Sequence, residues 1–144
     1  MKKIYLLDTN VISEVTRPVP DEKLLANLEF HHDTCAISTI TWFELLKGVE
    51  LLEDGQKKDK LHSFLFDYVL PSFEVVTYDL HAADINANLV AKLIKLGKTP
   101  PILDTQIASI AIANNMVLVT QNTKDFEVFA TEDVLMLESW GTDN

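Results

Sequence analysis

The sequence predicts an α/β fold in which a central, mostly parallel β-sheet carries helices on both of its faces. Two observations indicate this class. Short apolar runs of strand length alternate along the chain with longer segments in which apolar residues recur at helical spacing. The 144 residues also contain 47% hydrophobic residues, which is ample for one core, so we expect a single domain over residues 1–144.

Five short apolar segments are predicted to be strands. The first is the run Ile4–Leu7, which stops at the polar residues Asp8, Thr9 and Asn10. The predicted strands cover residues 4–7, 34–38, 74–78, 117–119 and 134–137. Ligands of parallel sheets bind beyond the carboxyl ends of the strands, so the polar residues that follow each strand are the first candidates for a site.

The segments between these strands are predicted to be helices. Ser38 can cap one of them, Gly97 ends another, and a third is expected to stop before Pro71. Residues Pro100–Pro101 impose a non-helical entry into a last helix that is apolar enough to be buried. The predicted helices extend over about residues 11–15, 20–28, 39–52, 57–70, 79–96 and 102–114.

The charge balance is unfavourable for a protein that acts on nucleic acid. The formal net charge is −10, and Arg17 is the one arginine among 12 basic residues. Because phosphate binding depends on Lys and Arg, an RNA substrate would require divalent cations in an acidic cleft and grouped lysines. Two such groups occur, at residues 57, 58 and 60 and at residues 92, 95 and 98, although each also fits a solvated helix face.

The cellular compartment is predicted from the absence of a membrane span, a signal peptide and a second cysteine in the sequence. No run approaches the roughly 20 apolar residues that span a bilayer, and the start Met1–Lys3 leads into a strand without a signal-peptide pattern. The single cysteine, Cys35, excludes an intramolecular disulfide and lies in a segment predicted to be a buried strand. We therefore expect a cytoplasmic protein with no membrane association.

Three carboxylates stand where a ligand could bind. Asp8 directly follows the first predicted strand, Asp104 opens the apolar helix over 102–114, and Glu44 interrupts an apolar helical segment. A buried carboxylate such as Glu44 needs a partner or a metal. Each also has a structural explanation, because Asp8 and Asp104 suit helix N-termini and Glu44 can pair with Lys47 on a helix surface.

Two further candidates, Asn122 and Asp125, follow the strand over 117–119, at the same predicted sheet edge as Asp8. Asp125 can instead cap a turn at residues 126–128. Strand ends and helix starts thus bring several acids to one edge, where oxygen ligands suit Mg²⁺ or Mn²⁺.

Smaller polar residues accompany these candidates. Thr9 and Asn10 follow Asp8, and Thr120 follows the strand over 117–119 and precedes Asn122. They are expected to orient ligands or phosphate, or else to cap turns.

Other catalytic chemistries find little support in the residue types. The four histidines have no cysteine partner set and no HExxH spacing for zinc, and no nucleophile elbow for serine hydrolysis is present. The four glycines are scattered and form no phosphate-binding loop.

Four segments resemble the PIN-domain ribonucleases, specifically the VapC-like toxins of bacterial toxin–antitoxin pairs and, within them, the FitB subgroup. They occur in the family's order and run almost from end to end of the chain. The matching segments are Leu7–Glu14 with the LDTN motif, Ser38–Leu45, Asp104–Ala108 and Thr120–Phe126.

The resemblance implies a function and a site. Asp8, Glu44 and Asp104 would bind the metal, Mg²⁺ or Mn²⁺, and the chain would hydrolyse an RNA phosphodiester through a metal-activated water, with tRNA or rRNA as expected substrate. Some relatives carry an aspartate where this chain has Asn122, so either Asn122 or Asp125 would complete the site. Residues Pro100–Pro101 stand where many relatives have a glycine, so the shape of that loop is expected to differ.

The resemblance also implies partners. We expect a homodimer and a cognate VapB-like antitoxin, whose basic, extended tail would lie over the acidic cleft. The antitoxin would bind promoter DNA, which this chain would reach only through it.

Two rival functions stay open at this point. Asp8 could be the nucleophile or phosphoacceptor of a phosphatase or phosphorelay domain, although Asn10 stands where haloacid-dehalogenase phosphatases carry a second aspartate. The chain could also be a catalytically silent PIN-like binding module. Loss of a central acid would mark such a module, and Asp8, Glu44 and Asp104 are all present.

Overall fold

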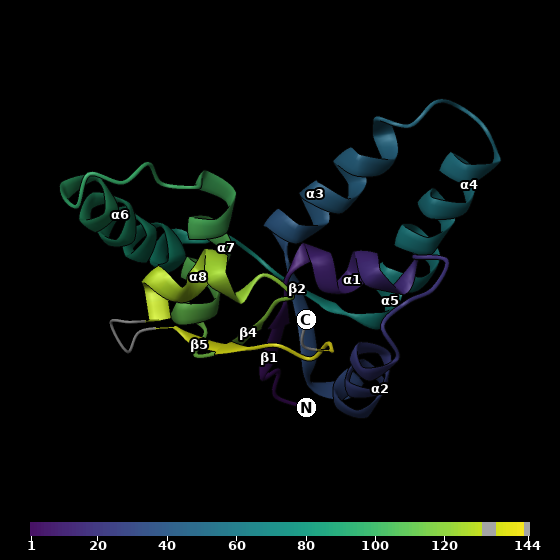
Figure 1. Ribbon diagram of the computed structural model, residues 1–144, viewed down its shortest axis with the longest axis horizontal. Helices are drawn as coiled ribbons and strands as arrows, with labels where there is room; N and C mark the ends of the chain where they lie inside the picture. Colours follow the sequence, from purple (N-terminus) through teal and green to yellow (C-terminus); the bar gives the residue numbers. More distant parts are fainter. Residues whose placement is uncertain (131–134, 143–144) are drawn as a thin grey trace.

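A computed structural model describes residues 1–130 and 135–142 (Figure 1). Its strands form one sheet in the order β3-β2-β1-β4-β5, and every neighbouring pair is parallel. The strands are β1 (Tyr5–Leu7), β2 (Cys35–Ser38), β3 (Glu74–Val76), β4 (Val117–Val119) and β5 (Met136–Glu138). The predicted α/β class is confirmed; Val134, the first residue of the last predicted strand, lies outside the described residues.

The helices begin close to the predicted positions. Asp21 and Ser38 cap α2 and α3, because their side chains accept hydrogen bonds from backbone N–H groups two or three residues further on. The helical elements are α1 (Thr9–Val15), α2 (Glu22–His31), the 3₁₀ turn η1 (His32–Thr34), α3 (Thr39–Glu50), α4 (Gln56–Ser63), the π-helix η2 (Phe64–Val69), α5 (Leu70–Ser72), α6 (Leu80–Lys95), α7 (Ile102–Ala113) and α8 (Thr123–Ala130).

Two helical segments differ from the prediction. The chain continues from α4 through η2 into α5 instead of ending before Pro71, because the proline occupies the first turn of α5, where its missing N–H is tolerated. Residues 123–130 form a full helix where a turn was expected. Phe126 and Phe129, three residues apart, are both buried and anchor this helix to the core.

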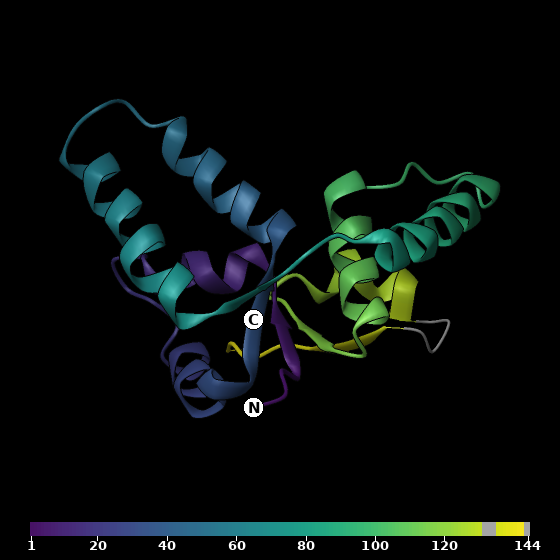
Figure 2. The same cartoon turned by 180° about the vertical axis from the view of Figure 1, so that it is seen from behind.

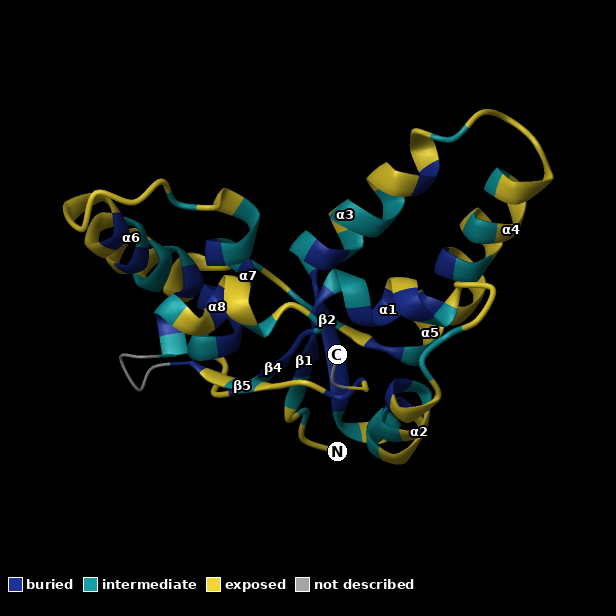
Figure 3. Cartoon of the chain, in the orientation of Figure 1, coloured by how far each residue is buried: buried dark blue, intermediate teal, exposed yellow. Residues whose placement is uncertain are grey.

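Successive strand residues point into two separate cores, one on each face of the sheet. Leu6 and Leu118 pack with residues of α6, α7 and α8, whereas Leu7 and Val119 pack with residues of α1, α2 and η2. Figure 3 shows β1 and β2 as buried and the edge strand β5 as largely exposed. Both faces of the sheet are therefore covered, as predicted, and the carboxyl ends of the strands are where ligand-binding groups can gather.

The strand order places the ends of β1 and β4 at a topological switch point. From β1 the chain proceeds to β2 and β3 on one side, and β4 and β5 lie on the other side. Ligands bind where the strand order reverses in this way. Helices α3 and α4 extend from one side of this edge and α6 and α7 from the other, in both views of the molecule (Figures 1 and 2). Within the described residues, no helix combines the length and the apolar character needed to cross a membrane.

Candidate active site

Asp8 occupies the switch point itself. It is the N-cap of α1, with a side chain that accepts a hydrogen bond from Thr9 N at 2.8 Å. The Thr120 hydroxyl donates to Asp8 Oδ2 at 2.8 Å, and the Asn10 amide donates to the same oxygen at 3.3 Å. Burial raises the pKa of Asp8 above its ordinary value, although the hydrogen bonds from Thr120 and Thr9 oppose this shift. Asp8 is thus both the N-cap of α1 and a buried carboxylate whose orientation is fixed by hydrogen bonds.

Asn10 ties the two central strand ends together. Its amide also donates to Thr120 Oγ1 at 3.2 Å, and its carbonyl oxygen accepts from Gln121 N at 3.0 Å. Thr120 in turn accepts from Asn122 N at 3.1 Å. Asn10 and Thr120 thus contact the Asp8 carboxylate and also accept hydrogen bonds from the backbone of the turn after β4. The expectation that they orient a bound ligand or phosphate stays a prediction.

Glu44 reaches the same region from α3. Its Oε1 accepts a hydrogen bond of 2.8 Å from the Thr9 hydroxyl, so the residue after Asp8 orients it. The alternative in which Glu44 pairs with Lys47 is not found: among the residues that the structure describes no ion pair joins them, and Lys47 Nζ lies 5.4 Å from the centre of the Phe43 ring. One turn beyond Glu44, Gly48 leaves open space: apart from the adjoining turns of α3, no described residue places a heavy atom within 4 Å of where a Cβ would be.

Asp104 lies in the first turn of α7, where the helix dipole favours a carboxylate. Its pKa is nevertheless raised from 3.8 to about 6, first by burial and then by the negative charges of Asp8, Asp125 and Glu44. Four carboxylates from four parts of the chain therefore interact electrostatically across one space.

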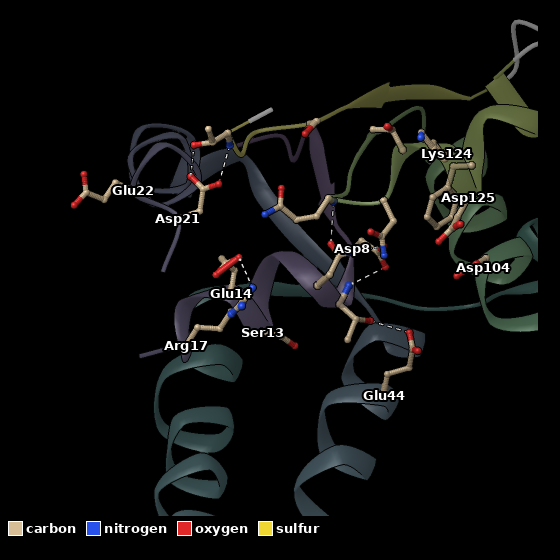
Figure 4. Close-up of a pocket in the computed structure, with 18 of the residues that line it drawn as sticks. Asp8, Ser13, Glu14, Arg17, Asp21, Glu22, Glu44, Asp104, Lys124 and Asp125 are labelled. Carbon is tan, nitrogen blue, oxygen red and sulfur yellow. Dashed lines mark hydrogen bonds and ion pairs between the residues drawn. The ribbon is translucent and has the colours of Figure 1, made fainter. Parts of the chain in front are cut away.

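These side chains line an open cleft of about 1610 Å³ (Figure 4). All five predicted site residues, including Asn122 and Asp125, contribute to its wall. The carboxylates in the lining are Asp8, Glu14, Asp21, Glu22, Glu44, Asp104 and Asp125. Among the residues that the structure describes, no three Asp, Glu, His or Cys side chains converge tightly enough to form a ready-made metal site. The acidic side chains therefore line one cleft but do not converge on a single metal position.

The cleft also contains residues that no sequence pattern assigns to a site. Glu14, Asp21 and Glu22 extend its acidic wall away from Asp8, and Arg17 and Lys124 are the cations in its lining. The lysine groups at 57, 58 and 60 and at 92, 95 and 98 are absent from that lining. Arg17 could have been suspected as the one arginine of the chain, and Lys124 because it adjoins Asp125.

Comparisons with known proteins agree with this architecture. A PIN domain family model matches residues 5–131. The FitB toxin of Neisseria gonorrhoeae is 37% identical over 140 residues, which cover 95% of this chain and 99% of the toxin. The VapC ribonuclease Y4jK of Sinorhizobium fredii is 34% identical over 127 residues, covering 86% of this chain and 91% of that protein. A solved structure of FitAB bound to the IR36 DNA fragment aligns with a TM-score of 0.85 at 33% identity, over 98% of this chain and 99% of that chain.

The parallel sheet and the carboxylates at its switch point define the class, and the match over residues 5–131 agrees: this chain belongs to the PIN domain family. Within that family it groups with the VapC and FitB toxins, as its four motifs predicted.

Proposed function

We propose that this chain is a divalent-metal-dependent endoribonuclease and the toxin of a toxin–antitoxin pair. The observation that carries the proposal is the shared cleft of Asp8, Glu44, Asp104 and Asp125, whose charges act on one another. The names of its relatives, a VapC ribonuclease and a FitB toxin, support RNA as the substrate and toxicity as the role. The RNAs to test first are tRNA and rRNA, and we assign the chain to the cytoplasm, where both occur.

The residues present fit a divalent cation. Carboxylate oxygens are the ligands that Mg²⁺ and Mn²⁺ prefer, and the mutual repulsion that raises the pKa of Asp104 is relieved by a bound positive charge. Asp8, Glu44 and Asp104 would hold the ion, with Asn122 or Asp125 completing the site. A small inward movement of these side chains on metal binding is part of the proposal, since the acids do not meet at one point.

The bound cation would supply Lewis-acid stabilisation of the charge that builds on the phosphate during hydrolysis. The chain's own residues prepare for this. Thr120 and Asn10 hold Oδ2 of Asp8, and Thr9 holds Oε1 of Glu44, so that both carboxylates keep their orientation before the ion arrives. The ionised form of Asp104 is the form that binds metal, so its protonation opposes binding.

The proposed partners follow from the relatives and from the charge of the cleft. The FitAB complex pairs a homologous chain with FitA and holds DNA. We propose an antitoxin of the VapB kind here, with a basic segment that lies against the acidic wall, and contact with promoter DNA only through that antitoxin. A homodimer of this chain is part of the same proposal.

The test is cleavage of total bacterial RNA by the purified chain with Mg²⁺ or Mn²⁺, with EDTA, and by the Asp8→Asn variant. We expect discrete cuts that require both the metal and Asp8. Asp59→Asn, which removes an exposed carboxylate on α4 outside the cleft, is the matched control and should cleave normally. Metal-dependent cleavage by Asp8→Asn at the rate of the unaltered chain would contradict the site.

The same assays separate the two rival functions. A phosphoacceptor would form an acid-stable, base-labile phosphoryl-aspartate at Asp8 in the presence of a phosphodonor, and a silent binding module would leave all RNA intact. Asn10 donates to Asp8 and to Thr120 and so acts as a hydrogen-bonding bridge, which disfavours the phosphatase.

A further inference from the structure

The cleft carries more negative charge than one metal ion at its centre can neutralise. A cation held by Asp8, Glu44 and Asp104 would offset the acids at the switch point. Asp21 and Glu22, further along the same wall, keep their negative charges. A single-stranded RNA that reaches the centre also brings its neighbouring phosphates into this acidic cleft, and phosphates bind through Lys and Arg.

Two cations of the lining lie on opposite sides of Asp8. In Figure 4, Arg17 is on the side of Asp21 and Glu22, and Lys124 is beside Asp125 on the other side, with Asp8 between them. Arg17 follows the end of α1, and Lys124 belongs to the first turn of α8. A strand that crosses the cleft through the proposed metal site therefore passes one cation on each side.

We propose that Arg17 and Lys124 bind the RNA phosphates on the two sides of the scissile phosphate. This inference rests on the proposed ribonuclease function. It also explains how a chain of net charge −10 can hold a polyanion. Few basic residues suffice when they lie along the path of the substrate.

The contacts of Arg17 fit this role. Its side chain is 68% exposed, and Nη1 lies 3.4 Å from Oε1 of Glu14, whose side chain is 9% exposed. This single long contact leaves the other guanidinium donors available for a phosphate. The nearly buried Glu14 acts as a positioning residue, because it restrains Arg17 at the rim of the cleft.

Lys124 is exposed, and among the described residues no ion pair or hydrogen bond engages its ammonium group. The lysines of α4 differ from Lys124 in their position. They are absent from the lining of the cleft, and Lys58 Nζ already pairs with Asp54 at 3.3 Å. Lys60, an exposed lysine of the same helix, is therefore a matched control.

The test measures RNA binding apart from cleavage. In the Asp8→Asn background, with Mg²⁺ held constant, fluorescein-labelled oligouridylate and oligoadenylate are titrated with protein at several salt concentrations. Arg17→Gln and Lys124→Gln should each lower the slope of log affinity against log salt by about 0.7, and the double variant by about 1.4. Both RNAs should weaken by the same factor, because a phosphate contact carries no base preference. Arg17→Lys and Lys124→Arg should retain the parental slope, and Lys60→Gln should match the parent.

Parental slopes in the two Gln variants, an equal loss in Lys60→Gln, or no RNA binding by the parent would overturn the inference. The proposed ribonuclease function is judged separately, by cleavage with the unaltered chain. If that chain cleaves RNA while Arg17→Gln and Lys124→Gln keep the parental slope, only the phosphate contacts are wrong. If the slopes fall as expected and no RNA is cleaved, the phosphate contacts stand and the ribonuclease function fails.

Discussion

The hydroxyl of Thr120 donates a 2.8 Å hydrogen bond to Oδ2 of Asp8, across 112 positions of the sequence. Asp8 follows β1 and Thr120 follows β4, so the parallel pairing of these strands makes the contact possible. Both residues are buried, and a carboxylate there is oriented by this hydroxyl before any ligand binds.

Replacing Thr120 with Val keeps the shape of the side chain and removes the donor. We expect Mn²⁺ affinity to fall by about 10- to 100-fold, the usual effect of losing a partner that orients a metal ligand. Isothermal titration with Mn²⁺ measures it. Thr34→Val is the matched control, because the Thr34 hydroxyl donates to His31 O at the other end of the sheet. Equal Mn²⁺ affinity in both variants would show that Thr120 does not orient Asp8 for metal.

Thr9 offers the corresponding test for Glu44. Thr9→Val removes the 2.8 Å hydrogen bond to Glu44 Oε1, and Thr9→Ser keeps the hydroxyl. We expect Mn²⁺ affinity and RNA cleavage to fall in Thr9→Val and to remain near the parental values in Thr9→Ser. A loss of equal size in both variants would show that the effect does not depend on the Thr9 hydroxyl.

Asp104 should make the metal-free protein less stable as the pH rises. Its pKa of about 6 in the folded chain exceeds the ordinary 3.8, so the folded state binds the proton more tightly than the unfolded state does. The resulting stability is present below about pH 4 and is lost as the pH rises through about 6. Thermal unfolding in EDTA should therefore give Asp104→Asn a higher Tm than the unaltered chain at pH 7.5 and a much smaller difference at pH 4.5. Parallel Tm profiles for the two proteins would contradict the raised pKa.

The same carboxyl predicts how metal binding depends on pH. Because the cation binds the ionised form, Mn²⁺ affinity should increase as the pH rises through about 6 and level off above it. Titrations at pH 5 and pH 7.5 measure the change. In Asp104→Asn the affinity should be lower at both values and should depend less on pH; a dependence as steep as that of the unaltered chain would assign the titration to another group.

Cys35 should react only when the protein unfolds. The thiol is fully buried in β2, its Sγ donates to His31 O at 3.2 Å, and burial raises its pKa to about 12. Labelling with a thiol reagent should be slow in buffer and fast in denaturant. Fast labelling of the folded chain would show that the N-terminal end of the sheet opens readily.

Much of the fold follows from local patterns in the sequence. The apolar runs located the strands, and the cap Ser38 located the start of α3, because a side-chain oxygen at that position meets an N–H group only three residues away. The helix α8 escaped prediction since its anchors, Phe126 and Phe129, matter only once a core lies beneath them. The continuation through Pro71 depends on a π-helix, which has no clear sequence signature.

The sequence predicted which residues belong to the candidate site, and it did not predict which of them contact one another. Asp8 and Asp104 were found because each stands at an element boundary. The sequence could not decide between Lys47 and another partner for Glu44, because Thr9 lies 35 positions away. Arg17 and Lys124 share a cleft only through the folding of α1 and α8 around one sheet edge, which no local pattern records.

The pairing of β1 with β4 also has a consequence during protein synthesis. A ribosome that has made the first hundred residues has released Asp8 and Glu44, whereas Asp104, Thr120 and Asp125 have not yet been added. Strand β1 then lacks one of its two neighbours, and Asp8 lacks its main hydrogen-bond donor. The carboxylate cleft can therefore form only after Asp104 and strand β4 have been synthesised, and a chain that stops at residue 100 lacks both.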